Sequence, residues 1–204
     1  KILYDDYRWR KESKERWGIL IMKIRCRQCA GYYKVRDGKF GVFAGCSNYP
    51  ACRSTLKLHE LVMAYIQEKG IRIYRWNKIC WKCGKETPVY SYYLGYELEE
   101  LDEYLGSFGM VGLGELPCVD QILEKEIPSI QPRYSNTVKS RYTANTCIHC
   151  GALQGRNYVV EDPHEIMDEL MFHHDMEKYY DRTIRMEDYS PLIPYLRSIY
   201  FTKD

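Results

Sequence analysis

Hydrophobic and polar positions follow two different periods along the chain, and each period predicts a different kind of element. Apolar residues recur at helical spacing just before Gly70, which fits a C-terminal cap. They are Leu58, Leu61, Val62, Tyr65 and Ile66. Beyond Gly70, the segment 71–95 alternates apolar and polar positions on both sides of a Cys-x-x-Cys-Gly turn, as strands do. The pattern therefore predicts a connector helix over 59–70, followed by paired strands.

Weaker patterns predict the remaining elements. Residues 1–22 mix aromatic side chains with charges of alternating sign and predict a helical segment. Helices are also expected at 97–105 and 119–126. The acidic segment 161–204 begins with a capping-box arrangement and is expected to form a helical tail. Between 23 and 58, turn residues and short aromatic runs indicate a small β-rich module.

The nine cysteines change this picture, because eight of them form four close pairs and only Cys118 is left over. Two thiolates in a tight turn converge on one tetrahedral ion, so such pairs indicate zinc rather than disulfides. The predicted ligands of two zinc ions are Cys26, Cys29, Cys46 and Cys52 for the first site, and Cys80, Cys83, Cys147 and Cys150 for the second. With four protein ligands each, both sites follow the closed pattern of structural zinc.

The ligand assignment of the second site is less secure than that of the first, since 63 residues separate its two knuckles. His149 or Cys118 could replace one of the cysteine ligands. The first module is too small to fold on its own core, so zinc is expected to stabilise it.

The fold class that follows is α+β, with small zinc-ribbon modules of short antiparallel strands and with connecting and C-terminal helices. We expect five parts along the chain: an N-terminal helical segment (1–22), a four-cysteine finger (23–58), a connector helix (59–70), a second zinc ribbon with a helical insertion (71–160) and an acidic helical tail (161–204).

Charge is distributed unevenly along the chain. Residues 1–58 carry 14 Lys and Arg against 5 Asp and Glu, a net +9, whereas residues 59–204 carry 16 against 23, a net −7. A basic front end favours nucleic acid as a partner. The same charges could instead neutralise the zinc sites, because four thiolates and one Zn²⁺ leave −2. A second basic stretch, 128–158, has no acidic residue and contains Arg133, Lys139 and Arg141 with interleaved tyrosines, so it is a second candidate nucleic-acid surface.

Within the first module, Asp37-Gly38 predicts the turn of a β-hairpin that brings Cys46 and Cys52 over the first cysteine pair. This segment resembles the four-cysteine zinc finger of the C-terminal repeats in bacterial type IA DNA topoisomerases. The resemblance covers about residues 24–57 and rests on the four cysteines together with "GKFG" (38–41), Phe43, "GCSNYP" (45–50) and Thr55.

The resemblance implies a zinc ribbon that binds DNA, chiefly single strands. It further implies that Phe40, Phe43 and Tyr49 stack on bases, while Lys39 and Arg53 lie near the phosphates. Stacking on aromatic rings contributes about 1–3 kcal/mol per base and tolerates any sequence. The alternative for each ring is that it covers the small core of the module.

Topoisomerase activity is not implied. The chain has no Asp-x-Asp motif and no room for the strand-cleaving domains. The best hydrolytic candidates are five residues of the tail: His164, Glu165, His173, His174 and Asp175. Adjacent histidines on a helix point about 100° apart, which does not suit one metal ion. We therefore expect no catalysis.

The sequence thus predicts a non-catalytic protein that binds zinc and nucleic acid, with single-stranded DNA favoured. The alternative is a zinc-ribbon adaptor between proteins that does not bind nucleic acid directly, with the acidic tail as a route to a protein partner. No apolar run approaches the ~20 residues that span a bilayer, and nothing resembles a signal peptide. No membrane association is expected, and reduced cysteines point to the cytoplasm.

Overall fold

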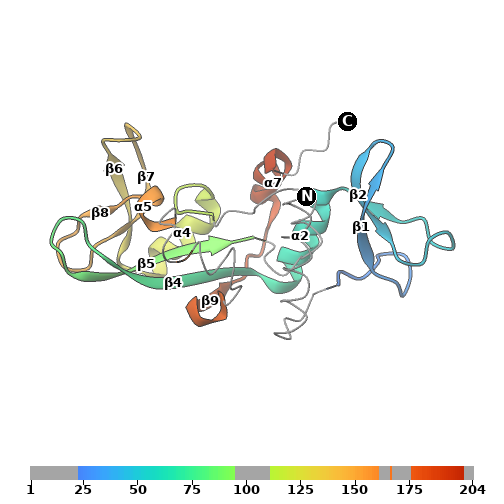
Figure 1. Ribbon diagram of the computed structural model, residues 1–204, viewed down its shortest axis with the longest axis horizontal. Helices are drawn as coiled ribbons and strands as arrows, with labels where there is room; N and C mark the ends of the chain where they lie inside the picture. The colour runs from blue at the N-terminus through green and yellow to red at the C-terminus, as the bar shows by residue number, and fades with distance from the viewer. Residues whose placement is uncertain (1–22, 95–110, 161–165, 167–175, 200–204) are drawn as a thin grey trace, which may run out of the picture. The chain divides into compact units, whose positions relative to one another are not determined.

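The computed structural model describes residues 23–94, 111–160, 166 and 176–199 and divides the chain into two compact units (Figure 1). The described part of the first unit is 23–69 and 188–199, and the second unit holds the remainder. The α+β class is confirmed, with three antiparallel three-stranded sheets among the described residues. The expected helices at 1–22 and 97–105 and the start of the tail lie outside the described residues.

The first unit begins with a small sheet of order β1–β2–β3, blue to teal in Figure 1. Strands β1 (Tyr33–Gly38) and β2 (Gly41–Cys46) form a hairpin, and β3 (Thr55–Leu56) pairs with the end of β2. Gly38 lies opposite Gly41, so the turn consists of Lys39 and Phe40. The predicted turn at Asp37-Gly38 is therefore wrong by two residues.

The reason for this register is the packing of Phe43. A Cβ atom built on Gly38 would lie 2.9 Å from the Phe43 ring, and one on Gly45 would lie 3.2 Å from it. The ring therefore covers two positions that have no side chain. Gly41 also adopts a φ of 109°, a left-handed conformation that glycine reaches without strain.

A helix follows the finger directly. Helix α2 (Leu58–Lys69) confirms the expected connector helix, and its buried residues are the five apolar positions of the sequence pattern. It contacts α7 (Ile193–Ile199), which continues from the short 3₁₀ helix η4 (Ser190–Leu192). Leu192 and Leu196 are buried, so η4 and α7 add apolar cover to the finger-bearing unit.

The second unit contains a sheet of order β5–β4–β9. Strands β4 (Ile71–Ile79) and β5 (Glu86–Tyr93) are the paired strands that the alternating pattern predicts. Strand β9 (Tyr180–Ile184), at the red end of the colour bar in Figure 1, pairs with β4 and follows the 3₁₀ helix η3 (Met176–Tyr179). The tail is therefore not helical throughout.

Ion pairs connect β9 and the 3₁₀ helix before it to the rest of the second unit. Arg72 on β4 lies 2.7 Å from Glu177 on η3, and Arg182 on β9 lies 3.0 Å from Glu126, outside the sheet. The sequence of β9 does not alternate clearly, so its strand conformation depends on the edge that β4 offers and on these contacts.

The other sheet of this unit has the order β6–β7–β8. Its strands are β6 (Ile130–Ser135), β7 (Ser140–Thr146) and β8 (Leu153–Gln154). Helix α4 (Pro117–Glu126) confirms the helix expected at 119–126, and α5 (Arg156–Val160) follows β8. None of the helices in the described ranges is both long and apolar enough to cross a membrane.

One buried side chain joins the two sheets of the second unit. Asn145 on β7 is 3% exposed and contacts the backbone of Tyr90 on β5. The Tyr90 N–H donates to Asn145 Oδ1 at 2.8 Å, and Asn145 Nδ2 donates to the Tyr90 carbonyl at 2.9 Å. Because Asn145 lies two residues before Cys147, this pair of bonds positions one cysteine knuckle relative to the other.

Candidate metal centres and nucleic-acid surfaces

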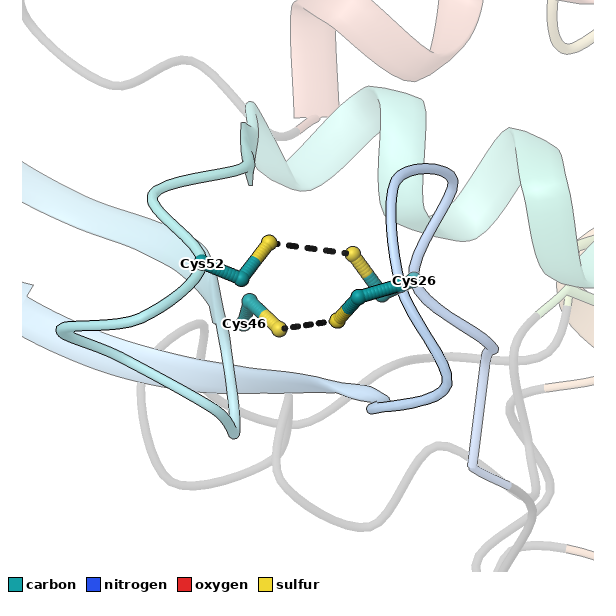
Figure 2. A group of neighbouring side chains, drawn as sticks. Cys26, Cys46 and Cys52 are labelled. Atoms are coloured by element: carbon teal, nitrogen blue, oxygen red, sulfur yellow. Dashed lines mark hydrogen bonds between the residues drawn. The ribbon is translucent and has the colours of Figure 1, made fainter.

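The first metal centre is formed by a knuckle before β1 and a loop after β2. The knuckle closes when the Cys26 N–H donates to the Gly31 carbonyl at 2.8 Å. The loop closes when the Cys52 N–H donates to the Asn48 carbonyl at 3.0 Å. The β1–β2 pairing brings these two turns together, and the cysteine sulfurs point toward one another (Figure 2).

The sulfur separations match a tetrahedral ion. Four sulfurs at about 2.3 Å from a zinc ion lie about 3.8 Å from one another. The distance between the sulfurs of Cys26 and Cys52 is 3.8 Å (Figure 2). That between the sulfurs of Cys29 and Cys46 is 3.4 Å. All four ligand atoms lie within 4.8 Å of one another.

Backbone amides support the thiolate form of this cluster. The N–H groups of Gln28, Gly31 and Asn48 donate to three of the sulfurs at 3.3–3.4 Å. The Gln28 N–H lowers the pKa of Cys26 to about 6. Although the Asn48 N–H acts in the same direction, burial and the neighbouring thiols raise the pKa of Cys46 to about 12. Four thiolates therefore need a cation to coexist here.

The second metal centre is built from two knuckles with matching hydrogen bonds. After β4, the Cys80 N–H donates to the Lys85 carbonyl and the Gly84 N–H donates to the Cys80 carbonyl. After β7, the equivalent bonds join Cys147 to Ala152 and Gly151 to Cys147. Gly84 and Gly151 have φ values of 67° and 69°, so each knuckle ends in a left-handed glycine.

The pairing of these knuckles across the 63-residue insertion is confirmed. Cys80 and Cys150 sulfurs are 3.7 Å apart, as are those of Cys83 and Cys147, and the four ligand atoms lie within 4.8 Å of one another. His149 is not in the cluster, and its Nε2 lies 2.9 Å from the Glu86 carbonyl oxygen. Cys118 belongs to α4 and is not in the cluster.

Hydrogen bonds between the knuckles account for this pairing. The Ile148 N–H donates to Thr87 Oγ1 at 3.1 Å, and Gln154 Nε2 donates to the Cys80 sulfur at 3.4 Å. Burial opposes ionisation of Cys80, but the N–H groups of Cys83 and Lys82 lower its pKa to about 6. Both cysteine clusters therefore fit zinc, and the chain provides sites for two zinc ions.

The predicted stacking residues of the finger differ in exposure. Phe40 occupies the tip of the β1–β2 hairpin and is 87% exposed, and Tyr49 in the cysteine loop is 63% exposed. Phe43 is half-buried over Gly38 and Gly45, so it is partly a core residue. Lys39 and Arg53 are exposed, and the Lys39 ammonium lies 5.6 Å from the Phe40 ring centroid.

The finger remains basic after its zinc site is counted. Residues 23–57 carry eight Lys and Arg against the single acidic residue Asp37, a net +7. A four-thiolate zinc centre contributes −2, which leaves +5. The basic residues therefore exceed what the metal centre needs for neutralisation.

The second candidate surface is the β6–β7 hairpin, and its three basic residues do not share one face. Arg133 pairs with Tyr142 and Tyr134 pairs with Arg141, so the two arginines project from opposite faces. Arg133 is half-buried and donates to Gln131 Oε1 at 2.7 Å. Arg141 and Lys139, in contrast, are exposed, and Tyr134 is 60% exposed.

Sequence reasoning missed the residues that hold the second centre together, Thr87, Asn145 and Gln154. It also passed over Trp81, which lies inside a cysteine knuckle and is exposed. An aromatic residue between two metal-binding cysteines was the available signal for Trp81. The polar residues gave no such signal, because their partners are far away in the sequence.

Comparison with known proteins supports the first centre. Residues 23–60 match the family described as topoisomerase DNA binding C4 zinc finger. DNA topoisomerase 1 of Archaeoglobus fulgidus is 45% identical over 65 residues, which make up 30% of this chain. The match spans only 10% of that relative's length. No solved structure matches the chain. The resemblance of the first module to the topoisomerase finger is thus confirmed for this segment.

Proposed function

We propose that the chain binds single-stranded DNA through its first zinc module and does not catalyse strand cleavage. One observation carries the proposal: two exposed aromatic rings, Phe40 and Tyr49, lie on a finger that keeps an excess of positive charge beyond its metal centre. The match to a DNA-binding zinc finger over 23–60 supports the same assignment.

Exposure of these rings favours single strands. An aromatic ring left in water forgoes about 1.5–3 kcal/mol of burial energy, so a ring at 87% exposure contributes little to the fold. Stacking on a base recovers about 1–3 kcal/mol, but a base in a duplex already stacks on its neighbours. Lys39 beside Phe40 and Arg53 near Tyr49 in the sequence supply charge for the phosphates.

The absence of catalysis is proposed from the chemistry of the centres. Each described cysteine cluster offers four thiolates to one ion, which leaves no coordination position for a reactive water. Their role is then to hold the turns that present the exposed rings. The histidines of the tail, 164, 173 and 174, lie outside the described residues.

A reducing, cytoplasmic location is proposed on the same chemistry. All nine cysteines are free thiols, and eight of them are grouped as metal ligands. Such ligands persist where thiols stay reduced.

Substitutions at Phe40 test the proposal. Phe40→Leu keeps an apolar side chain but removes the aromatic ring, so the Kd for a labelled single-stranded oligonucleotide should rise about 5-fold or more. Phe40→Tyr keeps the ring and should bind as the wild type does. Both variants should retain two zinc ions per chain.

Equal affinities for the wild type and Phe40→Leu would refute the stacking role of the finger. If the zinc-loaded wild type bound no nucleic acid at all, the chain would instead fit the adaptor hypothesis. Fluorescence anisotropy with zinc quantified on the same samples separates these results.

A further inference from the structure

The second zinc centre carries an exposed aromatic ring of its own. Trp81 lies between Cys80 and Cys83 and is 63% exposed, the same fraction as Tyr49 in the first centre. Each metal centre thus presents one large ring from within a cysteine loop. The second centre lies outside the segment matched by the finger family, so its ring has no assigned role.

The orientation of the Trp81 ring is fixed. Its indole Nε1–H donates to the Leu153 carbonyl on β8 at 2.6 Å, which ties the ring to the other half of the metal centre. The single polar group of the side chain is therefore satisfied, and the part left exposed is the apolar ring. A ring held in this way loses little conformational entropy when a flat ligand stacks on it.

A second aromatic ring is anchored close by in the same centre. The Tyr158 hydroxyl on α5 donates to the Ile79 carbonyl, directly before Cys80. The Lys78 side chain is buried and its ammonium lies 4.5 Å from the Tyr158 ring centroid, which adds positive charge over this ring.

Two lysines lie in the same knuckle as Trp81. Lys82 follows it directly and Lys85 closes the turn, and both side chains are exposed. Within the described part of the chain, neither ammonium group forms an ion pair. A fixed ring with unpaired cations next to it matches an unpaired base joined to a phosphate backbone.

We propose that the Trp81 knuckle, residues 80–85, is a second stacking site for single-stranded nucleic acid, with Trp81 on a base and Lys82 and Lys85 near phosphates. The proposal rests on the proposed function, since it assumes that single strands are the ligand of the chain. It extends that function from one zinc module to two.

The test uses the full zinc-loaded chain and labelled oligothymidylate. Trp81→Leu should raise the Kd about 5- to 150-fold, because it keeps an apolar side chain but loses base stacking. Trp81→Phe should retain most of the affinity. Ile148→Ala is the matched control: Ile148 is 57% exposed in the opposite knuckle but has no ring to stack, so its removal should leave the Kd unchanged.

Two further measurements identify the contact. Ultraviolet cross-linking to the same oligonucleotide, with peptides mapped by mass spectrometry, should modify Trp81. Lys82→Gln should make the negative slope of log K against log salt less steep by about 0.7, the value for one phosphate contact on a single strand. An unchanged slope would mean that Lys82 only neutralises the metal centre, against the proposal.

The results separate this inference from the proposed function. If Phe40→Leu weakens binding and Trp81→Leu does not, the second site is refuted and the finger stands. A loss with Trp81→Leu alone supports the second site and refutes the role of the finger. A comparable loss with Ile148→Ala would show a general apolar docking surface, which overturns the stacking proposal. A wild-type protein that binds no oligothymidylate refutes both.

Discussion

Replacement of Asn145 should destabilise the second unit more than the small size of this side chain suggests. Asn145→Ala leaves the N–H and carbonyl of Tyr90 without their partners in a buried environment. Each unsatisfied buried group costs about 1–3 kcal/mol, so the loss of two partners should lower the free energy of unfolding by about 2–6 kcal/mol. The isosteric Asn145→Asp should also lose stability at neutral pH, because it places a carboxylate oxygen against the Tyr90 carbonyl.

Urea unfolding of the zinc-loaded protein measures this change, and amide hydrogen exchange at Tyr90 reports on the bond itself. Zinc should also leave the second centre at lower denaturant, since Asn145 positions the Cys147 knuckle. Asn136→Ala is the control, because Asn136 is exposed in the β6–β7 loop and its loss should cost less than about 0.5 kcal/mol. If Asn145→Ala lost no more unfolding free energy than Asn136→Ala, the Asn145 side chain would not be what joins the two sheets.

Two further predictions concern a buried carboxyl group and a glycine. Burial raises the pKa of Asp120 to about 7, so the native state holds a proton that the unfolded state releases above pH ~4. The free energy of unfolding should therefore fall by about 1 kcal/mol between pH 6 and pH 8. Urea titrations of Asp120→Asn should show a smaller decline over this range. If the pH profiles of the variant and the wild type were parallel, the raised pKa of Asp120 would be contradicted. At Gly31, an added Cβ would lie 2.8 Å from Ser47 Oγ and 3.0 Å from the Cys46 sulfur. Gly31→Ala should thus lose zinc to a competing chelator before the wild type does. Gly155→Ala is the control, because an added Cβ there would meet open space, and it should keep zinc as the wild type does. If Gly31→Ala kept zinc equally well, the close packing of Gly31 against the metal centre would be refuted.

Local patterns predicted the elements whose contacts are local in sequence. The apolar positions of α2 repeat with the helical period, and all five are buried as expected. The ligands of both zinc centres were also predictable, because a cysteine knuckle is itself a local motif. The turn at Lys39-Phe40 was not predictable from a local pattern, since the register depends on Phe43 packing over glycines on both strands.

Elements that depend on distant partners were harder to predict. Strand β9 comes from the acidic tail and pairs with β4 more than a hundred residues earlier in the chain. The polar residues that join the two knuckles, Asn145 among them, are ordinary polar residues in a linear reading. Only their burial in the folded unit shows that they position the second metal centre.

The most direct test of the proposed function is to measure the binding of single-stranded DNA by the zinc-loaded chain at several salt concentrations. Fluorescence anisotropy should show tighter binding to single-stranded DNA than to a duplex of the same sequence. If Lys39 and Arg53 of the finger each meet one phosphate, these two contacts should contribute about −1.4 to the slope of log K against log salt. Absent binding, or equal affinity for the duplex, in protein that carries two zinc ions would contradict the proposed function.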